Sequence, residues 1–289
     1  MNVMYCGDAN IERGVFISVL SLLRNSQDTL HVYLLTAGFN EQERTYSPLS
    51  DAFARRLRIM VQEHDLAGSV ELIDITNRFL EDPPMANMDT RFSPCCMLRL
   101  YADEVAGLPD KILYLDNDVV CRSDCSVLFD QDMDGFEVAG VLDYYGRWFF
   151  RNNALHLDYL NSGVLLMNIP EIRRTSLFQK CRRMCASKKM FMPDQSAINS
   201  LATSKKILPR HFNEQRQLQS DTVLQHFTTS FRFFPWLRIV SVKPWNVNEM
   251  HQKLKLHEYD DILSEYEKRM PQSTGVRSDN PTQNEMRAS

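Results

Sequence analysis

The sequence predicts an α/β fold in which helices flank a doubly wound, mainly parallel sheet. In the N-terminal part, short apolar segments alternate with segments that have the periodicity of amphipathic helices. This order is typical of parallel sheets covered by helices on both faces. The chain has 289 residues, of which 44% are hydrophobic and 24% are charged. It is therefore long enough to bury a core without disulfides or a structural metal.

The N-terminal elements alternate between strand and helix. The first predicted strand ends at Gly7-Asp8, and the first predicted helix places Val15, Val19 and Leu22 on one face. The expected ranges are 2–6 (strand), 11–24 (helix), 30–35 (strand), 41–66 (helix) and 70–73 (strand). Three strands in this order predict one half of a doubly wound sheet.

The rest of the chain continues the pattern less regularly. After a loop with Pro83-Pro84, Ser93 and Pro94 have the residue types of a helix N-cap and first helical position. Further elements are expected at 94–105 (helix), 111–115, 136–142 and 161–168 (strands), 171–187 (helix), from 192 (helix), 223–227 (strand) and 248–270 (helix). We therefore expect a main domain at 1–246, a helical appendage at 247–271 and a disordered tail at 272–289.

Charge and glycine spacing exclude several classes of protein. The net charge of −4 is not that of a nucleic-acid-binding chain. No two glycines are separated by a single residue, which excludes the GxGxxG and GxSxG motifs, and HExxH is absent. Gly135 and Gly140 have P-loop spacing, but Val141 and Leu142 follow them instead of Lys and Ser or Thr. Common dehydrogenases, α/β-hydrolases, P-loop NTPases and zincins are thereby excluded.

The sequence predicts a cytoplasmic protein. Residues 1–6 lack the basic and long apolar parts of a signal peptide, and no apolar run reaches the roughly 18 residues of a membrane span. Seven cysteines, an odd number, indicate reduced thiols. The basic segment 173–189 is expected to be a solvated helix face, with peripheral contact at the inner face of a membrane as the most that it supports.

An acidic pair follows the most clearly buried strand. Residues 111–115 lead into Asp116, Asn117 and Asp118. In open α/β sheets, ligands bind at the carboxyl ends of strands. Two nearby carboxylates repel each other and favour a divalent cation, and oxygen ligands suit Mg²⁺ or Mn²⁺. The alternative is a polar loop in which Asp118 starts a turn.

The same triplet is compatible with a phosphatase of the haloacid-dehalogenase type. There the first aspartate, here Asp116, is the nucleophile and the second is the general acid. Such enzymes usually carry this pair on their first strand and a second acidic pair after a later apolar strand. Here the later pair, Asp260-Asp261, lies in a charged helical segment. This alternative therefore fits the chain less well.

Seven segments, taken in order, resemble the family 8 glycosyltransferases, a group that includes lipopolysaccharide galactosyl- and glucosyltransferases and glycogenin. They are Asp8 with Asn10, Arg99, Asp116-Asn117-Asp118, residues 161–168, Asp194-Gln195-Ser196, His226-Phe227 and Lys243-Pro244-Trp245. The resemblance covers about residues 1–246. It implies a GT-A fold, a UDP-sugar donor such as UDP-galactose or UDP-glucose, Mn²⁺ (or Mg²⁺) and retention of the anomeric configuration. It also implies a glycan, glycolipid or glycoprotein acceptor at the cell surface.

The resemblance implies a role for each matching residue. Asp116, Asp118 and His226 would hold the metal against the diphosphate. The other donor-binding residues would be Asp8, Asn10, Arg99, Asn117, Asn161, Gly163 and Lys243. The residue-level alternatives are a helix N-cap at Asn10, a plain salt bridge at Arg99 and a β-bulge at residues 161–163.

Asp194 and Gln195 are the expected catalytic residues, with helix capping as the alternative. An amide is a poor nucleophile, so we expect a front-face route in which the leaving phosphate accepts the acceptor's proton. Lys243 would bind the diphosphate, but the chain departs from the family here. An aromatic insertion at 230–242 precedes Lys243, and no glycine lies between His226 and Lys243. The insertion is predicted either to line the acceptor site or to be core.

A non-catalytic nucleotide-sugar-binding protein of the same fold is the main rival hypothesis. It would bind UDP without turnover.

Overall fold

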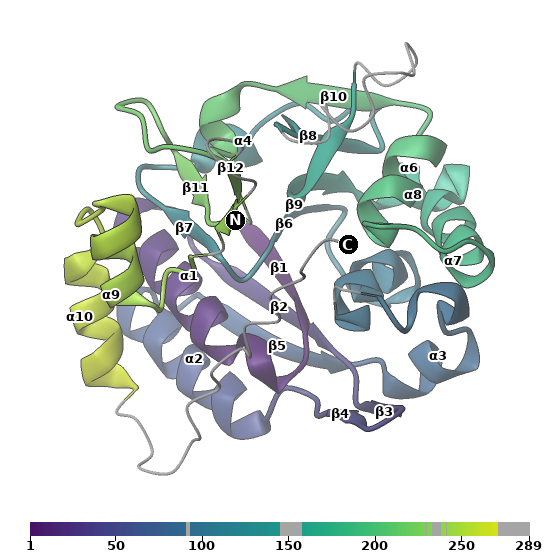
Figure 1. The fold of residues 1–289 in the computed structure, drawn as a ribbon, viewed down its shortest axis with the longest axis horizontal. Coiled ribbons are helices and arrows are strands. Elements are labelled where there is room, and N and C mark those ends of the chain that lie inside the picture. Colours follow the sequence, from purple (N-terminus) through teal and green to yellow (C-terminus); the bar gives the residue numbers. More distant parts are fainter. Residues whose placement is uncertain (91–92, 145–157, 229, 233–237, 241, 271–289) are drawn as a thin grey trace, which may run out of the picture.

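A seven-stranded sheet forms the centre of the described part of the protein (Figure 1). The computed structural model describes residues 1–90, 93–144, 158–228, 230–232, 238–240 and 242–270. The strand order is β10-β8-β9-β6-β1-β2-β5. The strands are β1 (Asn2–Gly7), β2 (His31–Thr36), β5 (Ser69–Asp74), β6 (Lys111–Leu115), β8 (Val138–Leu142), β9 (Leu160–Asn168) and β10 (Lys205–Leu208). Only β9 among them runs antiparallel to its neighbours, so the predicted mainly parallel α/β sheet is confirmed.

Helices cover both faces of this sheet (Figure 1). On one face lie α1 (Glu12–Asn25) and α2 (Asp51–His64), and on the other lie η3 (Pro94–Glu104), α6 (Ile169–Thr175), α7 (Leu177–Ser187) and α8 (Pro193–Leu201). The alternation of β1 supplies both cores. Val3 and Tyr5 are buried with α1 and α2, whereas Met4 and Cys6 are buried with η3. A period of two residues along a strand places neighbours on opposite faces in this way.

The remaining elements are short. They are η1 (Ala9–Ile11), β3 (Phe39–Glu41), β4 (Arg44–Tyr46), α3 (Thr76–Glu81), η2 (Met85–Asn87), β7 (Val119–Cys121), α4 (Ser126–Phe129), η4 (Arg210–Phe212), β11 (Leu224–His226), β12 (Ser230–Arg232) and β13 (Arg238–Val240). The predictions missed β7 and β10. Strand β7 pairs with β11 in an antiparallel ladder beside the main sheet. This pair carries two of the predicted metal ligands to one place.

The prediction of one helix over residues 41–66 was wrong. Strands β3 and β4 form a hairpin there, turning at Gln42 with φ 52°, and the helix begins only after Ser50. The Ser50 hydroxyl accepts a hydrogen bond from the Phe53 amide at 3.1 Å, which caps the helix. The predicted helix over residues 171–187 is likewise split into α6 and α7, because Ser176 has φ 56°.

The Ser93 cap was predicted correctly. Its hydroxyl accepts a hydrogen bond from the Cys95 amide at 3.2 Å, and the segment that follows is a 3₁₀-helix.

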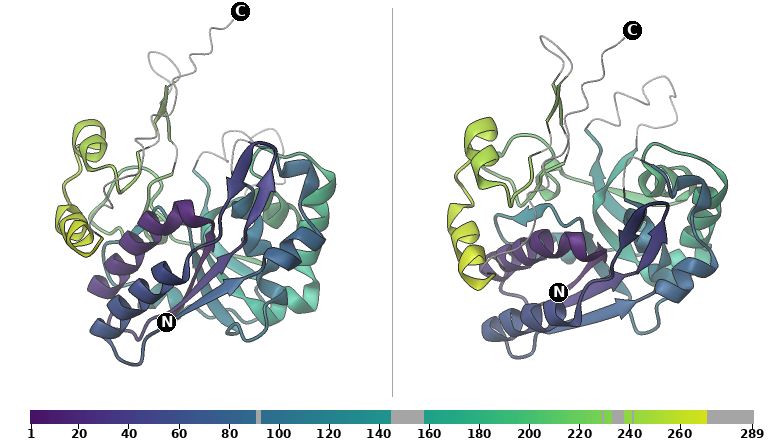
Figure 2. Two further views of the ribbon diagram at one scale, coloured as in Figure 1. Left: turned by 90° about the horizontal axis from the view of Figure 1, so that it is seen from below. Right: turned by 60° about the horizontal axis from the view of Figure 1, so that its bottom comes forward.

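The C-terminal appendage packs against α1 (Figure 2). It consists of α9 (Val247–Glu249), the π-helical segment η5 (Met250–Leu254) and α10 (Asp260–Arg269), so the single helix predicted over residues 248–270 is interrupted. Phe16 meets Tyr266 edge-on at a centroid distance of 5.8 Å, and Arg24 pairs with Glu265 at 2.7 Å. The predicted tail at 272–289, residues 145–157 and the side chains of residues 230–241 of the aromatic insertion lie outside the described residues.

Two further observations bear on the sequence predictions. All seven cysteines are free thiols. Among the described residues, no helix combines the length and the apolar character that crossing a membrane requires.

Candidate active site

One cavity of about 650 Å³ opens at the carboxyl ends of β1 and β6 and at the start of the antiparallel β9. Every site residue that the sequence predicted lines it: Asp8, Asn10, Arg99, Asp116, Asn117, Asp118, Asn161, Gly163, Asp194, Gln195, His226 and Lys243. The sheet topology explains this convergence. Parallel strands end at one edge, and β9 begins at that edge because it runs in the opposite direction.

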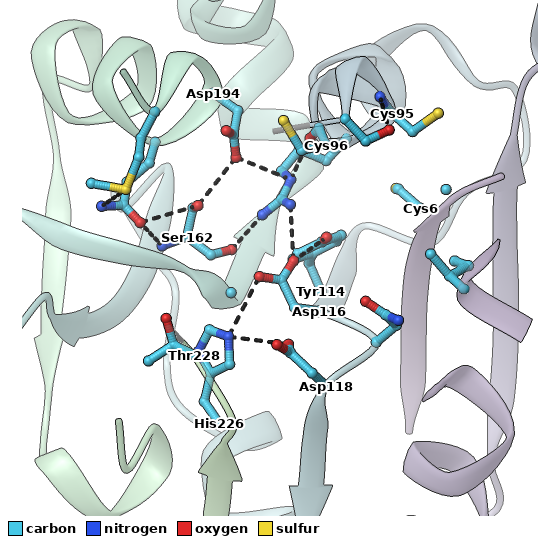
Figure 3. A pocket seen from close by; sticks show the side chains of 18 of the residues that line it. Cys6, Cys95, Cys96, Tyr114, Asp116, Asp118, Ser162, Asp194, His226 and Thr228 are labelled. Carbon is cyan, nitrogen blue, oxygen red and sulfur yellow. Dashed lines mark hydrogen bonds and ion pairs between the residues drawn. The ribbon is translucent and has the colours of Figure 1, made fainter. Parts of the chain in front are cut away.

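Asp116, Asp118 and His226 form what we term the strand-end cluster (Figure 3). Asp116 follows β6, Asp118 precedes β7, and His226 ends β11. His226 Nε2 lies 3.2 Å from Asp118 Oδ1 and 3.6 Å from Asp116 Oδ2. One ligand atom from each residue lies within 4.8 Å of the others. Two carboxylates and an imidazole at this spacing suit a divalent cation such as Mn²⁺.

Gly163 keeps space open beside this cluster. A Cβ atom added at this position would lie 2.2 Å from His226 Cε1 and 2.7 Å from Asp116 Oδ2. Such distances are far below any van der Waals contact, so a side chain here would displace two of the three ligands. The Gly163 carbonyl also accepts a hydrogen bond from the Asp116 amide at 2.8 Å. A glycine in this place is therefore what the close approach of His226 and Asp116 to β9 requires.

The charges within the strand-end cluster compensate one another. Burial raises the pKa of Asp118, but the nearby Lys243 and His226 outweigh burial and hold this pKa below its ordinary value. Burial lowers the pKa of His226, but the Asp118 and Asp116 carboxylates more than reverse this effect and raise it. The Lys243 ammonium donates to Asp118 Oδ2 and, at 3.3 Å, to the Phe227 carbonyl. Lys243 thus contacts Asp118 through Oδ2, whereas the other oxygen of this carboxylate faces His226.

Arg99 connects the strand-end cluster to the predicted catalytic pair. Its guanidinium is buried and donates to Asp116 Oδ1 at 2.9 Å and to the Ser162 carbonyl at 2.6 Å. Its Nε lies 3.4 Å from Asp194 Oδ2. The guanidinium carbon is also 3.9 Å from the centre of the Tyr114 ring, and Tyr114 donates its hydroxyl to Asp116 Oδ1 at 2.6 Å. One fixed cation therefore orients two carboxylates on different elements.

Asp194 and Gln195 are held by Ser162 in β9 and by Asp143, which follows β8, and neither serves as a helix cap. Asp194 Oδ2 accepts from the Ser162 hydroxyl at 3.1 Å. Gln195 Oε1 accepts from the Ser162 amide at 2.9 Å, and Gln195 Nε2 donates to Asp143 Oδ2 at 3.0 Å. Both side chains are almost completely buried. Their orientation is thus fixed by hydrogen bonds before any ligand binds.

The loop after β1 forms the other wall of the cavity. Asn10 does not cap α1; its side-chain amide donates to Asp8 Oδ2 at 2.8 Å. Behind this loop, a Cβ atom on Gly14 would lie 2.3 Å from the Asn117 carbonyl and 2.7 Å from the Trp245 ring. Gly14 therefore lets α1 approach the acidic loop closely.

Several residues of the site escaped the sequence analysis. The alternative of a β-bulge at residues 161–163 agrees with the pairing of β8 and β9, which is irregular between the pairs Leu142–Leu160 and Gly140–Leu165. Within it, the Asn161 amide is also tied to Asp143 at 2.9 Å and to Asn213 at 3.0 Å. Asp143 follows a predicted strand, and that position was a usable signal. Asn213 lies in no recognisable pattern. Arg44 and Tyr46 line the cavity from the hairpin that was predicted to be helical.

Comparisons with known proteins agree with this architecture. The family model described as glycosyl transferase family 8 matches residues 2–249. The lipopolysaccharide 1,2-glucosyltransferase of Escherichia coli is 26% identical over 274 residues, which cover 86% of this chain and 77% of that protein. The lipopolysaccharide 1,3-galactosyltransferase of Salmonella typhimurium is 24% identical, with 85% of this chain and 73% of that protein covered.

The fold has solved counterparts as well. The crystal structure of the galactosyltransferase LgtC in complex with donor and acceptor sugar analogues superimposes with a TM-score of 0.63 and 18% identity. The match covers 92% of this chain and 96% of LgtC. At this identity the likeness shows the fold, whereas the family match extends over most of the sequence. The chain belongs to glycosyl transferase family 8.

Proposed function

We propose that this protein is a retaining, metal-dependent hexosyltransferase that moves glucose or galactose from a UDP-sugar to a cell-surface glycan, such as lipopolysaccharide or a glycoprotein. The observation that carries the proposal is the strand-end cluster beside the buried Arg99–Asp194 pair in one cavity. The relatives named above act on lipopolysaccharide with glucose or galactose, which supports this donor and acceptor class.

The residues of the strand-end cluster fit a divalent metal. The two carboxylates suit both Mg²⁺ and Mn²⁺, and the imidazole favours Mn²⁺ over Mg²⁺. Asp116, Asp118 and His226 would hold it, in the space that Gly163 leaves free. The chemistry that a cation held there would supply is neutralisation of the negative charge that develops on the diphosphate as the bond to the sugar breaks. Lys243, whose ammonium contacts Asp118, would bind a phosphate oxygen of the diphosphate.

The remaining walls of the cavity provide groups for the rest of the donor. Asp8 and Asn10, on the loop after β1, have the acceptor and donor atoms that a uracil and a ribose require. Asn117 faces the same cavity from the acidic loop. Asn161 and the backbone at Gly163 lie at the opposite wall, next to Asp194, where the sugar would be placed.

The hydrogen bonds favour a front-face transfer over a covalent intermediate. Asp194 already shares its charge with Arg99 and the Ser162 hydroxyl, and such a carboxylate is a weak nucleophile. Gln195 Oε1 accepts a hydrogen bond from the Ser162 amide, so this oxygen is not free to attack the sugar. Burial raises the pKa of the Cys96 thiol well above its usual value, so this neighbouring group stays protonated. Asp194 and Gln195 would therefore orient the sugar and support positive charge at its anomeric carbon, while the leaving phosphate accepts the acceptor's proton.

We further propose that the enzyme works in the cytoplasm, with peripheral contact at the inner face of the membrane at most. UDP-sugars and the lipid-linked precursors of surface glycans meet at such a place. On α7, the exposed Lys180 and Arg183 would face an anionic membrane, whereas Arg182 is buried and paired with Asp103, contrary to the prediction of a wholly solvated basic face.

UDP release from a panel of UDP-sugars, with Mn²⁺ and with EDTA, tests the proposal. We expect slow, metal-dependent hydrolysis of UDP-glucose or UDP-galactose without acceptor, and faster release with the right glycan. Binding of UDP and Mn²⁺ without turnover of any donor, with or without a glycan acceptor, would instead support the non-catalytic rival. Hydrolysis of simple phosphomonoesters through Asp116 would support the phosphatase alternative.

A further inference from the structure

A second group of metal-ligating side chains lies in the appendage, away from the cavity. His251, His257 and Asp260 form this group, which we term the appendage cluster. His251 Nε2 lies 2.6 Å from Asp260 Oδ1, and His257 Nδ1 lies 3.1 Å from Asp260 Oδ2. The two imidazoles are 4.0 Å apart between centroids and tilted by 28°. One ligand atom from each residue lies within 4.8 Å of the others.

Unusual backbone brings these side chains together. His251 lies in the π-helical segment η5. The π-helix is rare in proteins, and where it occurs it is often at a functional site. The chain then turns back at Lys255, which has φ 57°, a conformation that is costly for a residue with a side chain. The Leu256 amide bonds to the Met250 carbonyl at 3.3 Å and closes this turn. The result places His257 over His251 and directs both rings at the first residue of α10.

The charges around the appendage cluster leave it available for a cation. Lys253 pairs with Glu249 at 2.5 Å, and Arg122 pairs with Glu258 at 2.9 Å, so these two cations have carboxylates of their own. Both oxygens of Asp260 face an imidazole. The side chain of His257 is 64% exposed, so its ring can rotate to share one ion with His251.

We propose that His251, His257 and Asp260 form a second metal site, which takes a transition-metal ion of the Zn²⁺ class and fastens η5 to the start of α10. Two imidazole nitrogens and one carboxylate with a water in the fourth position are a ligand set that Zn²⁺ accepts. Nitrogen ligands favour Zn²⁺ over Mg²⁺ or Ca²⁺. The strand-end cluster contains two carboxylates and only one imidazole, so it favours cations that prefer oxygen ligands.

The position of the site indicates a structural role. Tyr259, between His257 and Asp260 in the chain, donates its buried hydroxyl to Gln225 Oε1 at 2.8 Å and packs edge-on against Phe227 at 6.0 Å. Gln225 and Phe227 flank His226. An ion at the appendage cluster would therefore stabilise the packing of the appendage behind β11 without contacting the cavity.

Cobalt binding tests this inference. Co²⁺ in a site with few ligands gives strong visible absorption bands, whereas an octahedral, oxygen-rich site gives weak ones. The absence of a near-ultraviolet thiolate-to-cobalt band excludes the cysteines. The measurement uses the full chain and the Asp116→Asn/Asp118→Asn variant, in which the strand-end cluster is disabled. His257→Ala is introduced into each of these two proteins. The matched control is His64→Ala, because His64 is an exposed histidine outside both clusters.

We expect the double-asparagine variant to bind one Co²⁺ per chain, and His257→Ala to weaken this binding at least about tenfold. His64→Ala should leave it unchanged. Zn²⁺ should raise the melting temperature of the double-asparagine variant, and His257→Ala should abolish this rise.

Equal Co²⁺ affinity in the His257→Ala and His64→Ala proteins would overturn the inference. So would the absence of strong visible bands in the double-asparagine variant. If that variant does not fold, the wild-type chain decides: two ions per chain falling to one in His257→Ala supports the site, and an unchanged count contradicts it. None of these readings depends on transferase activity.

Discussion

The strand-end cluster and the appendage cluster contain the same kinds of side chain but differ in their surroundings. Asp118 and His226 are buried, Arg99 orients Asp116, Lys243 contacts Asp118, and Gly163 leaves open space. In the appendage cluster, His251, Asp260 and His257 are 30%, 42% and 64% exposed. The comparison teaches that similar ligand atoms can lie in very different surroundings, and this is why we propose catalysis for the strand-end cluster alone. Counter-charges, burial and an adjoining cavity make the difference.

The strongest test of this comparison removes one carboxylate of the strand-end cluster. Asp118→Asn should lower kcat for transfer by about 1000-fold or more, because the substitution removes one of the three proposed metal ligands. UDP release under saturating donor and Mn²⁺ measures the effect. Asp134→Asn, the same change at an exposed position, should retain wild-type activity. A similar loss in both variants would mean that net charge rather than metal binding matters.

The next test separates orientation of the sugar from donor binding. Asp194→Asn should lower kcat by about 100- to 1000-fold while KM for the donor changes by less than about threefold, because in our proposal Asp194, which is paired with Arg99, orients the sugar and does not bind the nucleotide. Steady-state kinetics with the preferred UDP-sugar give both constants. Equal losses in kcat and in UDP affinity would show that Asp194 supports the binding site as a whole.

The space beside Gly163 provides a test of metal binding alone. Gly163→Ala should weaken Mn²⁺ binding by about 10- to 100-fold, because its Cβ would displace His226 and Asp116. Calorimetric titration with Mn²⁺ checks this. Gly140→Ala is the matched control in the neighbouring strand β8, where the Cβ would meet the Leu165 side chain at 3.0 Å and the Val164 carbonyl at 3.3 Å but neither His226 nor Asp116. Undiminished Mn²⁺ affinity in Gly163→Ala would mean that the metal binds elsewhere.

Protons should compete with the metal at His226. The pKa of this buried imidazole is raised above its ordinary value, so it begins to be protonated at a higher pH than a free histidine. Only the neutral ring binds a metal, so Mn²⁺ affinity should fall by about tenfold per pH unit below that pKa. Asp118, with its lowered pKa, stays ionised throughout this range. Titrations at pH 8, 7 and 6 measure the trend, and an affinity independent of pH would exclude His226 as a ligand.

Much of this site was predictable from the sequence because its parts are local. The strand at residues 111–115 and the acidic residues after it were evident from a short apolar run, and β6 matches it. His226 and Asp194 were identified only through the order of the segments along the chain. The contacts of Asn213 and Asp143 depend on which strands are neighbours, and no local pattern encodes that.

The failures of prediction have local physical causes. The hairpin β3–β4 was hidden because Gln42 adopts a left-handed conformation without being a glycine. The same holds at Ser176, which divides the predicted helix over 171–187, and at Lys255, which ends η5. Helical periodicity continues across such positions in the sequence, whereas the backbone does not. The appendage cluster was missed for this reason.

The smallest expected effect concerns the connection between the two clusters. Tyr259→Phe removes the hydrogen bond to Gln225 and should lower the free energy of unfolding by about 1–2 kcal/mol. Urea denaturation measures the change. Mn²⁺ affinity at the strand-end cluster should stay within about twofold of wild type, because the Tyr259 hydroxyl lies behind β11 rather than in the cavity. A large loss of Mn²⁺ affinity would show that the appendage positions His226.

The central claim is that the strand-end cluster binds a divalent metal together with a uridine diphosphate. Calorimetric titration of UDP into the wild-type protein and the Asp116→Asn/Asp118→Asn variant, each with Mn²⁺ and with EDTA, tests it most directly. We predict that the wild type binds UDP tightly only with Mn²⁺ and that the variant loses this dependence and most of the affinity. Equal UDP affinity with and without the metal, or equal affinity in both proteins, would contradict the account.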